Sequence, residues 1–586
     1  MSSRTRLVQL IAAIGLVAIC LHLFFFTFTS PSPTPRLTPQ PDSALGNGAL
    51  RLDPDVHIDK PKPAPVVKLP PPECTPAQDL SRPPVDPEPA EPGDHLAFLR
   101  KMVSKTKGYY VRDWSLGLGW NNMRYIIEAS LMHATTMNRT LVLPSFVYAR
   151  ACEHHISVCQ QFTYMVNRGD AIGWNDWRDL PIEEQMGFRI PIGLMLNVTH
   201  MRTKYNVLDF HDYLDLHNLS RNIEWGSGAF DRNGYLNTKP NRISFSIIPN
   251  DKYDPKDVIR ADSYPDTGKE IVVKNQALGD RLKAAAGDAI ILDWEKAMKA
   301  LRASSDAEGE QLVKDAGWVT LWTFAPFLGM EFVKSPVMPA RQVAPHSVVR
   351  GLLEEFGGAT EEVVLLAGET HLNRKPGSLR FSTRKALDDY MRLCLYDLRY
   401  LDKLHVVAQR AGQRMTEKVK GRMWMAAQMR RGDFAKLGWA MEKTIEGHFQ
   451  RIQDRLRKGR EVIIQLLGEK NQTLFEIPDV SPHTGFFYLE PPEANDPFYL
   501  ATDERSPDGL QYAKEHGAIF ISDLITYEDR QYVGWPLLVT DVSALLEQLV
   551  MAQSEYFYGH AMSSVAGGVV NMRAARGVDA RTYLID

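Results

Sequence analysis

Residues 117–144 read GLGWNNMRYIIEASLMHATTMNRTLVLP, and this stretch decides the fold expected for the first half of the chain. Gly117 and Gly119 allow a sharp turn and a close approach of the backbone to a ligand. Apolar residues then recur at helical spacing until Asn138 breaks the pattern. The apolar run at 140–143, stopped by a proline, predicts a short buried strand.

A glycine turn that opens a helix directs backbone N–H groups and the positive end of the helix dipole toward the same point. This arrangement favours an anion, so we hypothesise an anion site at Gly117–Gly119. The glycines alone also fit an ordinary surface turn before a core helix.

Length and composition restrict the class of protein. A chain of 586 residues exceeds what one hydrophobic core supports, so at least two lobes are expected. With 44% hydrophobic residues, 24% charged residues and a net charge of −3, the chain is globular and lacks the basic excess of a nucleic-acid-binding protein.

The N-terminus predicts a membrane anchor. Residues 7–29 are apolar and long enough to span a bilayer of ~30 Å. Arg4 and Arg6 precede this span, which keeps residues 1–6 cytoplasmic and sends the rest into the lumen. A cleaved signal peptide is the alternative, but the span ends in FFFTF rather than in small residues.

Residues 30–95 are crowded with proline and predict a disordered, extended stem. A short tail, one anchor, a stem and a large lumenal part are typical of type II enzymes of the Golgi or endoplasmic reticulum. Glycosyltransferases are built this way, and so are some proteases and sulfotransferases.

Cysteines and sequons fit a lumenal setting. Cys152 and Cys159 enclose a short loop and can form a disulfide in an oxidising compartment. The adjacent His154-His155 leaves zinc as an alternative, although zinc ligands usually come as two separated pairs. Glycosylation sequons begin at Asn138, Asn197, Asn218 and Asn471.

The second half alternates between strand and helix. Strands are predicted at Trp424–Met429, Glu461–Leu467, Phe498–Asp503 and Ala518–Ile521, and helices at Glu442–Lys458, Gly509–His516 and Ser543–Ser554. Earlier in the chain, strands are expected at Ala289–Asp293 and Val363–Leu366, and one long helix at Ala386–Gly412. This alternation predicts an α/β protein with parallel sheets, whose ligands bind where strands end. We divide it into lobes at 96–403 and 404–586.

Candidate binding residues follow two of these segments. Arg430 lies just past a strand, and its planar fork of donors matches a diphosphate. A surface ion pair, for instance with Asp433, is the alternative. Ser563 and Ser564 follow a turn at Gly559, where hydroxyls and backbone N–H groups could hold phosphate or simply be solvated.

Taken in order, these motifs resemble the protein O-fucosyltransferase superfamily, whose members use GDP-fucose. Residues 117–124 resemble its G-x-G-x-N-x-x-R turn, 138–144 its N-R-T-L-V-x-P strand and 428–434 its H-L-R-R-x-D-F segment. Residues 499–504 are similar to its A-T-D strand. Glu547 with the segment 556–564 resembles its D…F-I-G…S-S ending.

The resemblance implies two Rossmann-like lobes facing a cleft (the GT-B arrangement), with the nucleotide mainly on the second lobe. It implies inverting transfer of fucose to a protein or glycan hydroxyl, with no metal and no cofactor besides the donor GDP-fucose. Arg430 and Asn121 are the implied catalytic residues. The implied donor-binding residues are Gly117, Gly119, Asn121, Gln428, Arg430, Asp433, Asp503, Glu547, Ser563 and Ser564.

Three positions depart from the family pattern. Gln428 replaces a histidine and cannot titrate. Glu547 replaces an aspartate and keeps the negative charge on a longer side chain. Leu118 stands where some members carry a glutamate that acts as general base, so the base is unassigned, with Asp433 a candidate by type alone. Two alternatives therefore stay open: a transferase using another GDP-sugar, and a catalytically silent member that binds nucleotide or glycan. The acceptor loops are expected between residues 150 and 400.

Overall fold

The computed structural model describes residues 92–169, 180–237, 242–249, 257–327, 330–368, 379–436, 438, 440 and 442–586. The predicted tail and anchor lie outside these residues, as does the stem up to residue 91. Helix α2 (Pro92–Val103) takes up the last residues that we assigned to the stem, because Leu99 and Met102 bury against the first lobe. Across the described ranges, no helix is both long and apolar enough to cross a membrane.

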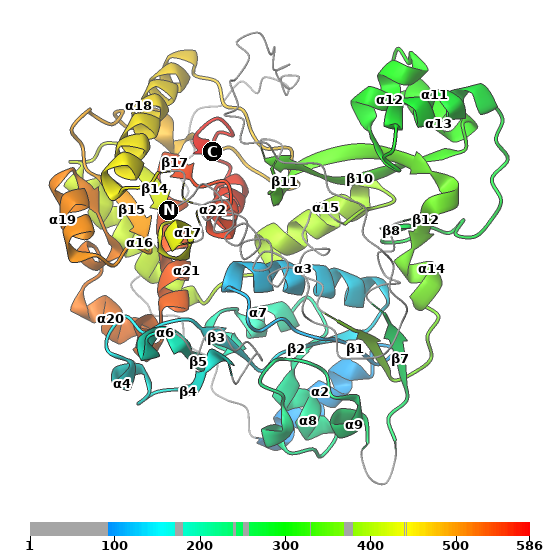
Figure 1. Ribbon diagram of the computed structural model, residues 1–586, viewed down its shortest axis with the longest axis horizontal. Coiled ribbons are helices and arrows are strands. Elements are labelled where there is room, and N and C mark those ends of the chain that lie inside the picture. The colour runs from blue at the N-terminus through cyan, green and yellow to red at the C-terminus, as the bar shows by residue number, and fades with distance from the viewer. Residues whose placement is uncertain are drawn as a thin grey trace, which may run out of the picture. The chain divides into compact units, whose positions relative to one another are not determined.

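The first sheet is five-stranded and wholly parallel. Its order is β6 (Val207–Asp209), β2 (Thr140–Leu143), β1 (Tyr109–Arg112), β13 (Val363–Leu366) and β7 (Phe245–Ile248). Successive side chains of a strand point to opposite faces, so Tyr110 and Tyr109 enter two different cores. Helix α3 (Trp120–Thr136) covers the face to which Tyr110 points, and Figure 1 shows it beside β1 and β2.

The second sheet repeats this plan. Its order is β16 (Ala518–Ile519), β15 (Phe498–Thr502), β14 (Met425–Met429), β17 (Tyr556–Gly559) and β18 (Tyr583–Ile585), again all parallel. Helix α18 (Ile445–Glu469) covers one face, as Figure 1 shows. The other face is buried with helices α16 (Asp402–Lys418), α21 (Thr540–Met551) and α22 (Ser564–Ala575). The prediction of a mixed α/β protein with parallel sheets is confirmed.

Three local predictions are corrected. The strand expected at Glu461–Leu467 lies inside α18, because Ile463 and Leu466 bury on the same helical face as Leu456. The strand expected at Ala289–Asp293 is reduced to β9 (Leu292–Asp293), which pairs only with the edge of a long hairpin.

The third correction concerns the helix expected at Ala386–Gly412. It is divided into α15 (Arg384–Arg392), a π-helical turn at Leu393–Asp397 and α16. The guanidinium of Arg124 donates to the carbonyl oxygens of Cys394 (2.9 Å) and Leu398 (3.0 Å), and thereby holds the break in place.

A large module is inserted between β7 and β13. It contains the two-stranded sheet β8 (Ile259–Ala261) and β12 (Val349–Gly351), and the hairpin of β10 (Trp318–Phe327) and β11 (Met330–Pro345). Three helices form a separate core with this hairpin: α11 (Gln276–Ala286), α12 (Trp294–Leu301) and α13 (Asp306–Asp315). The hairpin also packs against α22, so a segment expected to contribute acceptor loops approaches the second lobe.

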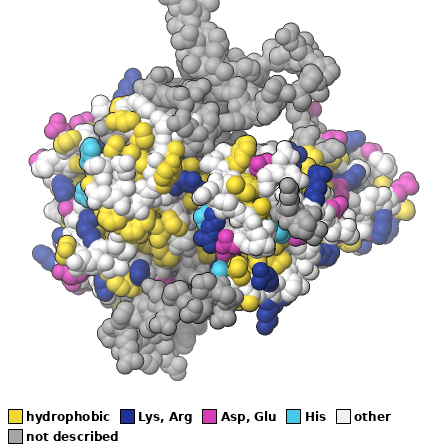
Figure 2. All heavy atoms as spheres, turned by 90° about the horizontal axis from the view of Figure 1, so that it is seen from below, with side chains coloured by type: hydrophobic (Ala, Val, Ile, Leu, Met, Phe, Trp, Pro, Cys, Tyr) yellow, Lys and Arg dark blue, Asp and Glu magenta, His cyan; other side chains and the backbone are white. Residues whose placement is uncertain are grey.

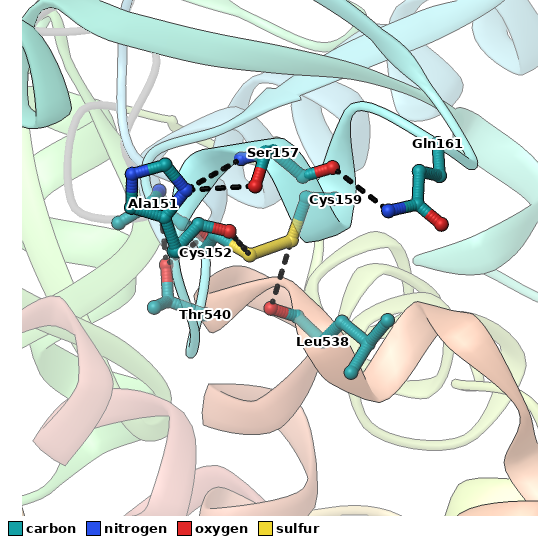
Figure 3. Close-up of a disulfide and its surroundings, with 8 residues drawn as sticks. Ala151, Cys152, Ser157, Cys159, Gln161, Leu538 and Thr540 are labelled. Atoms are coloured by element: carbon teal, nitrogen blue, oxygen red, sulfur yellow. Dashed lines mark hydrogen bonds between the residues drawn. A yellow bond between two sulfur atoms is a disulfide. The ribbon is translucent and has the colours of Figure 1, made fainter.

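A disulfide loop joins the two lobes (Figure 3). Cys152 and Cys159 are disulfide-bonded, so neither is available as a thiolate ligand for zinc. The Ala151 carbonyl accepts the Thr540 N–H (3.0 Å), the Leu538 carbonyl accepts the Glu153 N–H (2.8 Å), and the Cys159 sulfur lies 3.3 Å from the latter oxygen. The loop is therefore held against the residues that lead into α21.

Basic and acidic side chains are interspersed on the face of the molecule that Figure 2 shows. Among the described residues visible there, neither sign forms an extended surface, in keeping with the small net charge of −3.

We expect the substitution Cys152→Ser to destabilise the protein by roughly 2 kcal/mol, because the disulfide restricts a short loop of the unfolded chain. The measurement is the thermal midpoint of the wild type and the variant, each with and without reductant. Reductant should lower the midpoint of the wild type toward that of the variant. Equal midpoints in all four samples would contradict a stabilising role.

Candidate functional site

Three neighbouring strands of the second sheet end at the same edge. Strand β14 leads into Arg430, β15 into Asp503 and β17 into the segment that reaches Ser563. Because β15, β14 and β17 are adjacent and parallel, their carboxyl ends bring these side chains together. We call Gln428, Arg430, Asp503 and Ser563 the edge cluster.

Arg430 is positioned by Asp503. Its Nη1 donates to Asp503 Oδ2, while Asp503 Oδ1 accepts the backbone N–H of Arg431 at 2.7 Å. The Arg430 guanidinium also lies over the ring of Phe434, 5.0 Å from its centroid. A β-carbon on Gly432 would lie 2.4 Å from Asp503 Oδ2, so a larger residue there would displace this carboxylate. Asp503 therefore orients the arginine.

Gln428 and Ser563 form the second half of the edge cluster. The Gln428 amide donates to Ser563 Oγ at 2.9 Å, and both residues are buried. Ser563 is the N-cap residue of α22, yet its side chain makes no capping bond. The first N–H groups of α22 and the hydroxyl proton of Ser563 are thus available to an anion. Ser564 is the first residue of this helix.

The amide oxygen of Gln428 is buried and has no hydrogen-bond partner within the described part of the chain. Buried polar atoms are nearly always paired. A donor supplied by a ligand would satisfy this oxygen.

Glu547 lies on α21, next to the edge cluster. Burial, with a smaller contribution from the nearby carboxylates of Glu153 and Asp503, raises its pKa to about 8. Its partner is Tyr499, whose hydroxyl donates to Glu547 Oε1 at 3.4 Å. Glu547 is therefore mostly protonated at neutral pH in the absence of a ligand.

The glycine turn of the first lobe reaches the second lobe through Asn121. Asn121 Oδ1 accepts from the amide of Gln548 at 2.8 Å, and Gln548 Oε1 accepts from the hydroxyl of Tyr400 at 3.1 Å. A β-carbon on Gly568 would lie 3.5 Å from Asn121 Oδ1. Gly568 is one helical turn, about 6 Å, from Ser564, so Asn121 lies close to the start of α22.

The other residues of the turn either support the fold or leave backbone N–H groups of α3 without a side-chain cap. Gly119 is the N-cap residue of α3 and provides no side-chain cap, so the first N–H groups of α3 lack a capping partner. Leu118 packs against the hydrophobic core. Arg124, the arginine of the turn motif, is buried against Glu128 and the π-helical turn.

Asp433 lies in α17 (Gly432–Lys436), and its side chain is outside the described part of the structure. Its assignment as donor-binding residue or base stays a prediction.

Glycosylation of the four sequons also stays a prediction. Asn138, Asn218 and Asn471 are exposed, and Asn197 caps α7 (Val198–Arg202) by accepting the His200 N–H at 2.9 Å.

One residue near the turn escaped the sequence analysis. The guanidinium of Arg150 lies over Gly119, where a β-carbon would be 3.2 Å from Arg150 Nη2. Arg150 belongs to no motif and is one of 68 Lys and Arg residues. Only its position directly after an apolar run distinguishes it.

The described residues contain no group of three or more His, Cys, Asp or Glu side chains arranged to hold a metal ion.

Comparisons with known proteins give a distant structural likeness. The sequence matches no family profile, and no curated protein is significantly similar. Crystal structures of POFUT1 in complex with GDP-fucose and with GDP match with TM-scores of 0.31 and 0.32. Each is 11% identical, and each match covers 82% of this chain and 98% of that chain. At this level the likeness sets neither the family nor the activity, which the residues of the site have to carry.

We expect Glu547 to make folding less favourable as the pH rises. Its folded pKa of about 8 lies above the ordinary value of 4.5, so its contribution is fully present below about pH 4.5 and is lost as the pH rises through 8. The substitution Glu547→Gln removes this dependence. Thermal midpoints measured between about pH 5 and pH 8 should fall less for the variant than for the wild type. Parallel profiles would contradict the assigned pKa.

Proposed function

We propose that this protein is a glycosyltransferase that transfers fucose from GDP-fucose to a hydroxyl of a protein or glycan, with inversion and without a metal. The observation that carries the proposal is the convergence of Arg430, the Gln428–Ser563 pair and the uncapped start of α22 at one sheet edge. Asn121 approaches the same helix from the first lobe. The two parallel sheets are consistent with a GT-B arrangement.

The edge cluster suits a nucleoside diphosphate. A guanidinium presents two parallel donors to phosphate oxygens, and a helix start adds backbone N–H groups and a positive dipole. When the sugar leaves, negative charge develops on the β-phosphate of GDP. Preorganised donors at that position stabilise the charge without reorganising, which is the contribution we assign to Arg430 and Ser563.

Gln428 has two roles in this proposal. By donating to Ser563 Oγ, its amide leaves the serine proton directed away from itself and able to donate to phosphate. Its unpartnered oxygen can accept from a hydroxyl of the sugar. A glutamine therefore fills the family's histidine position without needing to titrate.

Glu547 suits the guanine base. An ionised carboxylate accepts two N–H donors from the Watson–Crick edge of guanine. Because the pKa of Glu547 is raised, this proposal requires that guanine binding shifts the group toward its ionised form.

The general base remains open within the proposal. Leu118 packs in the core, so the turn supplies no carboxylate there. In a transition state with oxocarbenium character the acceptor hydroxyl can lose its proton late, which lowers the demand for a strong base. Asp433 stays a candidate.

Leu118 and Gln428 favour the alternative of a catalytically silent member, and a transferase that uses another GDP-sugar is the alternative within the enzyme class. A type II anchor in the Golgi or endoplasmic reticulum remains part of the proposal. The Cys152–Cys159 disulfide supports an oxidising compartment.

The substitution Arg430→Ala should lower GDP release from GDP-fucose by ~10²–10³-fold, because it removes a charge-assisted contact made in the transition state. The assay follows GDP release with a panel of GDP-sugars, with and without acceptor mixtures. Arg457→Ala, which removes an exposed arginine of α18, is the control for loss of charge. An unchanged rate in Arg430→Ala would refute the assignment. Nucleotide binding without turnover of any GDP-sugar would favour the alternative of a catalytically silent member.

The affinity for GDP should rise with pH up to about 8, because guanine binds the ionised form of Glu547 and the free protein holds that group protonated. Isothermal titration between about pH 6 and pH 8 measures this, and Glu547→Gln should bind GDP weakly with little pH dependence. A wild-type affinity that is constant over this range would contradict the guanine assignment.

A further inference from the structure

We propose that Arg150 is a second cation for the donor, binding the β-phosphate of the sugar nucleotide from the first lobe. This inference rests on the proposed function and names one more residue of the same site. It starts from the small antiparallel sheet that carries Arg150.

That sheet places two arginines at one edge. Its order is β3 (Phe146–Ala149), β5 (Met186–Pro191) and β4 (Tyr164–Asn167), with β3 and β4 both antiparallel to β5. Strands β3 and β4 therefore run in the same direction and end at the same side. Arg150 follows β3 and Arg168 follows β4, and Arg168 donates to the Arg150 carbonyl. The Arg168 contact fixes the backbone from which the Arg150 side chain extends.

The side chain of Arg150 lies on the glycine turn. A β-carbon on Gly119 would be 3.2 Å from Nη2, 3.4 Å from Cζ and 3.7 Å from Nε of Arg150. Similar distances to all three atoms mean that the guanidinium lies across the position that a side chain would occupy. The absence of a side chain at Gly119 thus makes room for the cation at the uncapped start of α3.

The charge of Arg150 is not balanced by an ion pair. Among the described residues its guanidinium makes no hydrogen bond and no ion pair. The nearby carboxylate is Asp541, in the first turn of α21, which accepts the Arg150 backbone N–H at 2.6 Å. Burial and then the positive charge of Arg150 lower the pKa of Arg168 to about 10, whereas the carboxylates of Asp541 and Glu184 act in the opposite direction. Of the two arginines, Arg150 is therefore the one whose guanidinium carries a charge without an ion pair among the described residues.

In the edge cluster, by contrast, the cation is paired. Arg430 is paired with Asp503, so the two together carry no net charge. A diphosphate bound there still needs a cation, and Arg150 supplies one from the opposite lobe. Its place beside Gly119, two residues before Asn121, brings it toward the start of α22 and the phosphate end of the nucleotide.

The test is isothermal titration of the purified full chain with GDP and with GMP, which lacks the β-phosphate. Arg150→Ala should weaken GDP binding by ~10–100-fold, the effect of losing a charge-assisted hydrogen bond, and should leave GMP binding nearly unchanged. Arg150→Lys should recover part of the loss, because it keeps the charge but not the planar fork. Arg221→Ala, at an exposed arginine of the first lobe, is the matched control.

Gly119→Ala provides a test that keeps every charge. The new β-carbon displaces the guanidinium by a few tenths of an ångström, so GDP binding should weaken by less than in Arg150→Ala. If Gly119 acts through Arg150, the double variant should bind GDP no more weakly than Arg150→Ala alone. If Arg150→Ala fails to fold, the same comparison can be made with Arg150→Lys in its place.

The outcomes separate the inference from the proposed function. A wild type that binds no GDP overturns both. GDP binding that is weakened by Arg430→Ala but unchanged by Arg150→Ala keeps the proposed function and overturns the role of Arg150. Unchanged GDP binding with a raised KM for the acceptor would place Arg150 on the acceptor instead, which also overturns the inference.

Discussion

The hydrogen bond from Gln548 to Asn121 is the contact on which the arrangement of the site depends. It joins the start of α3, on the first sheet, to α21 and α22, which cover the second. Gln548 is fully buried and its other end accepts from Tyr400, so both ends of the amide are used. A buried amide left unpaired costs about 1–3 kcal/mol, which makes any other register of the two helices unfavourable. The glycine turn is thereby held beside the start of α22.

The two charged groups near this contact are each compensated within the protein. Arg430 is balanced by Asp503, and Glu547 is held mostly neutral by burial. Most of the attraction for an anion then comes from backbone donors at two uncapped helix starts and from Arg150. These donors are fixed by secondary structure, so they are already in place before a ligand binds.

The same turn motif contains residues with different purposes. Asn121 connects the lobes, whereas Arg124 supports the fold by holding the carbonyls of Cys394 and Leu398. That support explains why the helix predicted across this region is divided. A motif residue is therefore not necessarily a ligand-binding residue, and Arg150, which no motif contains, lies closer to the turn than Arg124 does to any ligand position we assign.

The sequence by itself predicted the parallel α/β class, because strands that alternate with helices favour parallel sheets. The residues of the edge cluster, as a set, came from the family resemblance. Only the tertiary structure decided that Asp503 pairs with Arg430, because the adjacency of β14 and β15 is a property of the assembled sheet. It also decided that 461–467 is helical, because an apolar run of that length suits a strand or a buried helix equally, and the face it buries selects between them. The contacts of Asn121 with Gln548 and of Arg150 with Gly119 are likewise set by the packing of separate elements rather than by local spacing.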